Sequence, residues 1–490
     1  MEMAMASHDS ITITVQDPPP PSALAPLENT ADSSKEDEAG ISQPSHTAQE
    51  RIPQIFEFLP KAGDHLLRTQ ARVIEKPCIY RVPHLLREVN KRAYEPNVIS
   101  IGPYHHGLDL ERFKVTEALK LSCFLTIFEE NNSVADKIVR SMQRLEAQVR
   151  ECYEEASDHL DSKEFVEMMV YDGCFIVLLI LGYADEDIFK AIGVLREIES
   201  DLLLLENQLP FFVLSELYRI IAPEEEEVHQ LSHHVISYFR NCLLFHLFDN
   251  LLPDKDIKHL LHLVHSCHRP SASGIKQHQD FKRRAASKPT SQRKMKFIGN
   301  ATELDDAGIN FLGAAIEKMK DQKPGIETEF DIMFTKHTKV LMIPTLNVYD
   351  CTERRFRNYI AYEQFIPCSE PTYFCDYVLF MDYLIDTNKD VQLLRKSGII
   401  ENALGDDEAV AQMFNRLMDS VYCSPTEFYY IEIFGRMTKH CQRRRNRWKA
   451  ALKKKYFNSP WSHISFFAAT VLLLLTIVQT IFSVFSYFDK

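Results

Sequence analysis

Residues 464–488 read ISFFAATVLLLLTIVQTIFSVFSYF, and this stretch decides how the 490-residue chain is organised. It lies within a run without Asp, Glu, Lys or Arg that begins at Tyr456 and ends at Phe488. As an α-helix, 25 residues extend about 37 Å, enough to cross a hydrocarbon core of about 30 Å with some tilt. Lipid offers backbone amides no partner, so a single segment can cross it only as a helix. The sequence therefore predicts one transmembrane helix over residues 461–488.

Cationic side chains cluster directly before this helix, within residues 439–455. Lys and Arg are enriched on the cytoplasmic flank of membrane helices, and each contributes about 1 kcal/mol at an anionic surface. Only Asp489 and Lys490 follow the helix, and the amino-terminus has no signal-peptide pattern. We therefore predict a single-pass plasma-membrane protein, anchored at its carboxyl end, with the bulk of the chain in the cytosol. The predicted membrane-interface residues are Arg443, Arg444, Arg445, Arg447, Lys449, Lys453, Lys454, Lys455 and Trp461.

One polar amide, Gln479, lies inside the apolar run. An amide in lipid gains from a partner helix, which predicts weak self-association through Gln479. The alternative is a single Gln tolerated near the far leaflet.

The rest of the chain has ordinary globular composition, with 45% hydrophobic residues and a net charge of −13. This charge argues against a nucleic-acid-binding chain. Eleven cysteines without a CxxC pair indicate free thiols of a reducing compartment. Residues 1–50 are rich in Pro, Ser and acidic side chains and are predicted to form a disordered leader.

Residues 75–455 are predicted to form a mainly α, multi-helix globular domain with one small β-hairpin. A flexible basic insertion is expected at 269–296, where Lys and Arg gather without an apolar period. Alternation of apolar residues predicts the hairpin over 330–342, turning near 336–338, and a separate short strand over 98–101. The predicted helices are 111–129, 135–159, 164–182 (buried at the centre), 196–221 (interrupted at Pro210), 223–250, 254–267, 302–320 (with Thr302 as N-cap), and most of the chain from Thr352, with breaks near 367–371, 398–406 and 423–425.

Several segments resemble the plant family named domain of unknown function 247, also called uncharacterised protein family 0481. The resemblance covers about residues 75–488 and implies a plant protein with a mostly helical, membrane-anchored domain and no assigned enzymatic activity. Some grass members are associated with self-incompatibility, a recognition role that is not carried over to this chain. The family supplies no catalytic residues. The matching segments are 80–83 (YRVP), 101–107 (IGPYHHG), 169–175 (MVYDGCF), 201–214 (DLLLLENQLPFFVL), 297–309, 343–364 and the tail from Trp448.

The chain carries no GxxxxGK[ST], GxGxxG, GxSxG or HExxH motif, so no catalytic, cofactor or metal site is predicted. His259, His262, His265 and His268 recur every third residue and are expected to be exposed or capping, because this step rotates them apart on a helix. Asp172, Glu206 and His105 are expected to be satisfied by structural hydrogen bonds. The alternative is that they line a polar pocket of an unrecognised enzyme.

The favoured function is a membrane-tethered interaction or signalling module that binds anionic headgroups, an unidentified protein partner and no nucleic acid. Arg284-Ala-Ala-Ser287 is typical of a basophilic kinase site, which makes Ser287 a candidate for phosphorylation. The nuclear or nucleic-acid-binding alternative rests on basic clusters that lack interleaved aromatics apart from Trp448.

Overall fold

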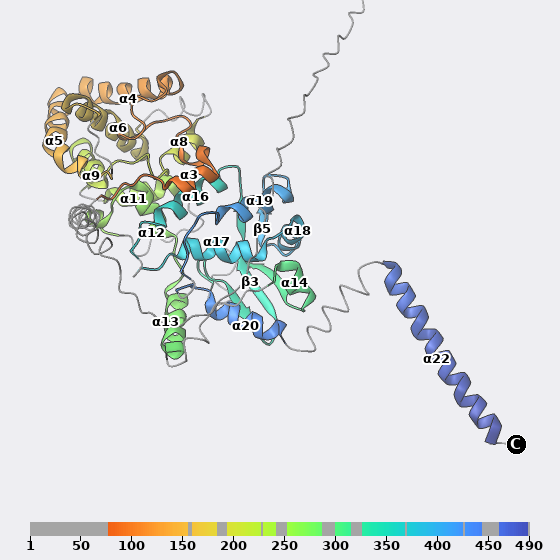
Figure 1. Ribbon diagram of the computed structural model, residues 1–490. Helices are drawn as coiled ribbons and strands as arrows, with labels where there is room; N and C mark the ends of the chain where they lie inside the picture. Colours follow the sequence, from red (N-terminus) through yellow and green to blue (C-terminus); the bar gives the residue numbers. More distant parts are fainter. Residues whose placement is uncertain are drawn as a thin grey trace, which may run out of the picture. The chain divides into compact units, whose positions relative to one another are not determined.

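The computed structural model describes residues 77–154, 159–183, 194–226, 229–241, 252–286, 299–314, 326–367, 370–424, 427–442 and 460–488. In these residues the chain is mainly helical with a few short strands, as the sequence predicts (Figure 1). The predicted leader, residues 1–50, lies outside this range.

The amino-terminal half packs around one buried helix, α6. The helices α4, α5, α9 and α11 contact α6 (Figure 1). A capping box formed by Asp161 and Glu164 begins α6, and Gly182 in the left-handed region ends it. Nearly all its side chains between Phe165 and Ile180 are buried, which confirms the predicted central helix. The helices of this half are α3 (His84–Val89), η1 (Lys91–Tyr94), α4 (Leu110–Glu130), α5 (Asn132–Arg150), α6 (Ser162–Leu181), α8 (Leu195–Asp201), α9 (Phe211–Ile221), α10 (Pro223–Glu226), α11 (Leu231–Tyr238) and η2 (Phe239–Asn241).

The helix predicted over 196–221 is two helices, α8 and α9, separated by the non-helical residues 202–210. The interruption begins well before Pro210, because buried amide side chains bind carbonyls that a continuing helix would use. Asn207 Nδ2 donates to the carbonyl of Asp201 at 3.0 Å, and Gln208 Nε2 donates to that of Leu202 at 2.7 Å. Two other predicted helices are also too long, since α5 ends at Arg150 and the described part of 223–250 contains only α10, α11 and η2.

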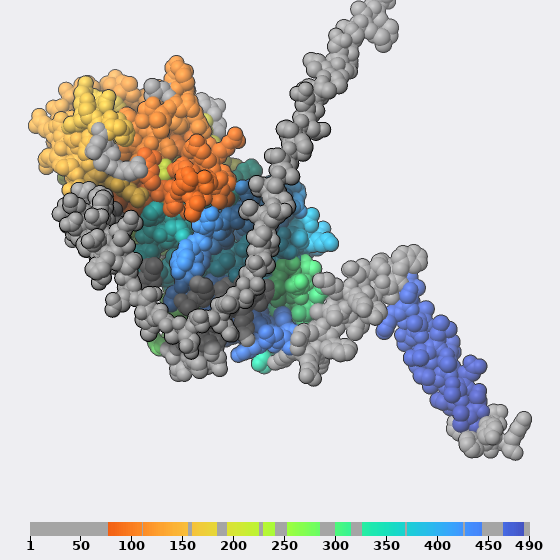
Figure 2. Space-filling view, viewed as in Figure 1, coloured from red at the N-terminus to blue at the C-terminus, as the bar shows by residue number. Residues whose placement is uncertain are grey.

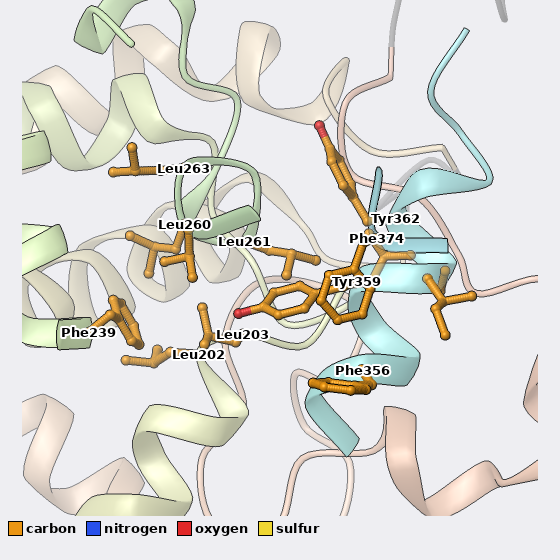
Figure 3. Close-up of a cluster of buried hydrophobic side chains, with 14 of the residues drawn as sticks. Leu202, Leu203, Phe239, Leu260, Leu261, Leu263, Phe356, Tyr359, Tyr362 and Phe374 are labelled. Carbon is orange, nitrogen blue, oxygen red and sulfur yellow. The ribbon is translucent and has the colours of Figure 1, made fainter. Parts of the chain in front are cut away.

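Aromatic and aliphatic side chains from distant parts of the sequence meet in one core. Figure 3 shows Leu202 and Leu203, which follow α8, with Phe239, three leucines of α12 and three aromatic residues of α16. Phe356 and Phe374 cross nearly edge to face, with ring centroids 4.9 Å apart. This core joins the amino-terminal helices to α16 and α17 of the second half.

The second half is helical with two small sheets. The predicted break after Lys396 contains the short strand β5, and α12 is preceded by the separate turn η3. The elements are η3 (Asp254–Asp256), α12 (Leu260–Cys267), α13 (Ala272–Ala286), α14 (Ala301–Asp306), β1 (Asn310–Ala314), β2 (Met333–Thr335), β3 (Val340–Pro344), β4 (Leu346–Val348), α16 (Thr352–Glu363), α17 (Tyr373–Leu384), α18 (Asn388–Lys396), β5 (Ile400–Asn402), α19 (Asp407–Leu417) and α20 (Ile431–Cys441).

The predicted hairpin is confirmed, since β2 and β3 pair antiparallel with Phe334 opposite Leu341. Its surroundings were not predicted. β1 pairs parallel with β3, and β4 pairs parallel with β5. The helix expected over 302–320 is wrong: α14 ends at Asp306 and the chain continues as β1. Its N-cap is Asn300, which accepts from the amide of Glu303, rather than Thr302.

The first part of the predicted flexible insertion is instead a helix, α13. Contacts with residues near α20 account for its order: Lys282 pairs with Glu427, and the rings of His278 and Tyr429 lie 4.8 Å apart. Residues 287–296 of the insertion, Ser287 among them, lie outside the described residues.

The last described element is α22 (Pro460–Phe488). Thr470, Thr476 and Thr480 each donate a hydroxyl to the carbonyl four residues earlier. This bonding satisfies the hydroxyls within the helix, so their presence does not oppose burial in lipid.

Candidate functional site

Residues 97–102 form an irregular segment whose backbone is held by side chains instead of a neighbouring strand. Asp201 accepts from the amides of Asn97 at 2.9 Å, Val98 at 2.7 Å and Ile99 at 3.0 Å. Further along the segment, Asn207 Oδ1 accepts from the amide of Ile101 at 2.6 Å. The strand predicted over 98–101 is therefore wrong, because carboxylate and amide side chains take the place of a pairing strand.

The carbonyls of the same segment are bound in the same manner. Thr116 Oγ1 donates to the carbonyl of Val98 at 2.6 Å, and Asn207 Nδ2 donates to that of Ile99 at 3.1 Å. The ammonium of Lys120 donates to the carbonyl of Ser100. A buried stretch of irregular chain is stable only when its polar backbone is paired, and here α4 and the 201–208 segment supply the partners.

Two buried ion pairs fix the ends of this segment. Arg354 Nη2 of α16 lies 2.7 Å from Asp201 Oδ1, which links the segment to the second half of the domain. Lys120 Nζ of α4 lies 2.8 Å from Asp172 Oδ1 of α6, while Asp172 Oδ2 accepts from the amide of Gly102 at 2.8 Å. Both pairs combine a charge with backbone hydrogen bonds, the arrangement that offsets the cost of burial.

Glu206 organises a third cluster. Its Oε1 accepts from the amide of Val82 at 2.7 Å and pairs with Arg87. Its Oε2 lies 3.6 Å from Arg81 Nη1 and 3.7 Å from His105 Nε2. Burial, together with the neighbouring charges of Arg81 and Arg87, lowers the pKa of His105 to about 4. His105 therefore sits neutral in the folded protein at physiological pH.

His105 makes folding pH-dependent in a defined direction. Between pH 6.5 and 4 the unfolded chain binds a proton at this ring and the folded chain does not, so stability falls as the pH falls through this window. The full effect is about 3 kcal/mol. His105→Gln should remove it, so urea titrations at a series of pH values should show wild type losing up to about 3 kcal/mol more stability than the variant between pH 7.5 and pH 4. Parallel curves for the two proteins would contradict this.

Of the residues of the enzyme alternative, Glu206 and His105 lie in one cluster and Asp172 lies in another. Asp172 is bound by Lys120 and Gly102, whereas Glu206 is bound by Val82 and two arginines. Both carboxylates hold the chain's own backbone, as expected from the sequence.

The histidines of α12 are mostly buried, so the expectation of exposed side chains is wrong. His259 caps α12 by accepting from the amide of His262 at 3.2 Å, which confirms the capping expectation for that residue. His265 Nε2 lies 2.9 Å from Glu363 and His268 Nδ1 lies 2.7 Å from Glu329. Within the described ranges, no group of three or more His, Cys, Asp or Glu side chains is arranged to hold a metal ion.

Sequence reasoning missed Lys120, Arg354 and Asn358 as members of the polar network. Asn358 Oδ1 accepts from the amide of Leu205 at 3.0 Å, and its Nδ2 donates to the carbonyl of Ala93 at 2.8 Å. Lys120 stands between Leu119 and Leu121 in the sequence, but a single charge in a helical pattern is usually exposed. No local signal identified these three residues, because each binds chain that is distant in sequence.

The predicted membrane-interface cations fall on residues outside the described ranges: Arg443, Arg444, Arg445, Arg447, Lys449, Lys453, Lys454 and Lys455. Trp461 lies in the first turn of α22. The 21 residues Ile464–Val484 of α22 form a segment that is long and apolar enough to cross a membrane. The apolar window of this segment is not buried within the described part of the molecule.

A family model described as a plant protein of unknown function, DUF247, matches residues 79–475. The chain belongs to the DUF247 family. The UPF0481 protein At3g47200 of Arabidopsis thaliana is 28% identical over 442 residues, covering 85% of this chain and 88% of the relative. The putative UPF0481 protein At3g02645 of the same plant is 23% identical over 494 residues, covering 84% and 90%. No solved structure matches the chain.

Five of the seven segments on which the DUF247 resemblance rests meet around residues 97–107. The 80–83 motif lies beside Glu206, the 169–175 motif provides Asp172, and the 201–214 motif provides Asp201 and Asn207. The 343–364 segment adds Arg354 and Asn358. In this chain these five segments therefore share a structural role, which is to fix an irregular buried segment.

Proposed function

We propose that this DUF247 protein is a single-pass plasma-membrane protein, anchored by α22, whose helical domain faces the cytosol as an interaction or signalling module. The observation that carries the proposal is the exposure of α22: Leu472, Leu473, Leu474 and Leu475 are each more than half exposed. A predominantly apolar surface of this length is expected to be covered in the cell. A bilayer covers it on every side.

The charge pattern supports the anchor and its orientation. The cationic residues 443–455 directly precede α22. Anionic headgroups attract such a segment, and the positive flank stays on the cytosolic side. The interaction role is supported by exposed apolar side chains on α4, among them Leu121, Leu125 and Phe128.

The test is extraction of the full-length chain from plant-cell membranes with alkaline carbonate. The full-length protein should stay in the membrane pellet, and a chain ending at Lys455 should be released. Leu474→Arg keeps the length of α22 but places a charge at its centre at a cost of about 3 kcal/mol, so it should reduce the pelleted fraction. Leu474→Ile is the matched control and should behave as wild type.

Release of the full-length protein by carbonate would contradict the anchor. Orientation is read separately, from an amino-terminal tag in sealed vesicles of known sidedness. The tag should be cleaved by protease added to the cytosolic face; protection there would reverse the assignment. Proximity labelling from the same tag reports the proteins that the domain meets.

A further inference from the structure

Helix α4 carries an apolar stripe on the face that α5 and α6 leave uncovered. Its inward side chains, such as Phe113 and Ile127, are buried. On the opposite face Leu121 is 42% exposed, and Leu125 and Phe128 are each 44% exposed. Figure 1 shows α4 along one edge of the helices that surround α6, and Figure 2 shows the same segment, in orange, at the surface.

The spacing of the stripe is that of a helix that packs against another helix. Ala118, Leu121, Leu125 and Phe128 follow one another at steps of three, four and three residues. This pattern keeps the four side chains on one narrow line along the helix.

The stripe is self-complementary in an antiparallel arrangement. With a two-fold axis near residue 123, the small Ala118 of one copy faces the large Phe128 of the other, and Leu121 faces Leu125 twice. A two-fold axis makes each contact occur twice, as in most homodimers. Interdigitation of small and large side chains is what close packing between two helices requires.

Charge favours the same arrangement. Lys114 stands at the amino-terminal end of the stripe, and Glu129 with Glu130 stands at its carboxyl end. In the antiparallel pair, Lys114 of one copy lies beside Glu129 of the second copy. Among the residues that the structure describes, Lys114 pairs with Glu111 alone, at 4.0 Å between two highly exposed side chains, and such a weak pair can give way to a stronger one.

We propose that α4 is a homodimerisation surface, on which a second copy of this chain packs antiparallel through Ala118, Leu121, Leu125 and Phe128. The proposal deepens the interaction role proposed above, and rests on it, by naming one partner. A stable soluble dimer needs about 800 Å² per partner, more than two 21-residue helices supply through one stripe. Confinement to the same membrane raises the effective concentration, so the contact forms between anchored copies.

The experiment measures energy transfer between labelled full-length proteins in lipid vesicles as the protein is diluted with lipid. Leu121→Ser combined with Leu125→Ser should weaken dimerisation at least about tenfold. Lys114→Glu alone and Glu129→Lys alone should each weaken it about threefold or more. The exchange variant Lys114→Glu/Glu129→Lys should return it to within about twofold of wild type.

The exchange variant is decisive because the two positions cannot meet within one helix. Fifteen residues separate them, a distance of about 22 Å along α4. All variants lie on exposed positions, and melting temperatures equal to wild type confirm that the domain stays folded. Loss of transfer in the single variants without recovery in the exchange variant would overturn the antiparallel pairing.

Association through another surface, or a different occupant of the stripe, would give a distinct result. If Gln479 alone drives association, Gln479→Leu abolishes transfer and the α4 variants do not change it. If a segment of the same chain covers the stripe, maleimide labelling of Leu125→Cys stays blocked at the highest dilution, where a dimer would have dissociated. Either result overturns the proposal, whereas failure of carbonate retention would instead remove the anchor.

Discussion

Asp201→Ala is expected to lower the free energy of unfolding by about 3–5 kcal/mol, the largest loss from any substitution in the polar network. Asp201 is fully buried and accepts from the amides of Asn97, Val98 and Ile99. Its removal leaves these amides without their acceptor and leaves Arg354 facing an empty site. The measurement is urea unfolding of the full-length protein in mild detergent, followed by near-ultraviolet circular dichroism.

Matched variants distinguish the effect of removing a buried carboxylate from the effect of removing any charged side chain. Glu167→Ala removes a surface carboxylate 3.8 Å from Lys163 and should change stability by less than about 1 kcal/mol. The double variant Asp201→Ala/Arg354→Ala should cost less than the sum of the two single variants, because no unpaired charge remains. An Asp201→Ala protein that unfolds within about 1 kcal/mol of wild type would show that water replaces the carboxylate.

The parts of the fold that the sequence predicts are those encoded locally. The apolar run of α6 and Gly182 at its end lie where the sequence predicts them, whereas the capping box of Asp161 and Glu164 was not predicted. The hairpin of β2 and β3 is marked by alternating apolar residues. For α22, the length and apolar composition of the segment alone were sufficient to predict a helix that could cross a membrane.

The parts that were missed depend on contacts between distant residues. Nothing near residue 310 shows that β1 pairs with Val340–Pro344, because a parallel partner is supplied by chain thirty residues away. The 202–210 segment reads as helix, yet Asn207 and Gln208 bind backbone that folding brings to them. At the site, burial of Asp172 and Glu206 could be expected from their apolar neighbours, whereas Lys120 and Arg354 could not.

The second large expected effect is at Gly102, where backbone geometry and packing both exclude a side chain. Gly102 has φ of 72°, and a Cβ there would lie 2.5 Å from the carbonyl oxygen of Gln208 and 3.2 Å from the hydroxyl of Tyr153. The Gln208 carbonyl cannot move freely, because it accepts from Tyr153 Oη at 2.9 Å. Gly102→Ala should therefore cost about 3 kcal/mol or more, from left-handed strain and the backbone clash together.

A substitution at Gly107, in the same loop, distinguishes the cost of the strain from the cost of the clash. Gly107 has the same φ of 72°, but a Cβ there would meet nothing within 4 Å. Gly107→Ala should cost only the strain, about 1–2 kcal/mol. The same urea titration compares both variants with wild type. Equal losses would show that strain dominates and that the Gln208 carbonyl yields, whereas a larger loss at Gly102 shows that the loop is held by direct backbone contact with the 201–208 segment.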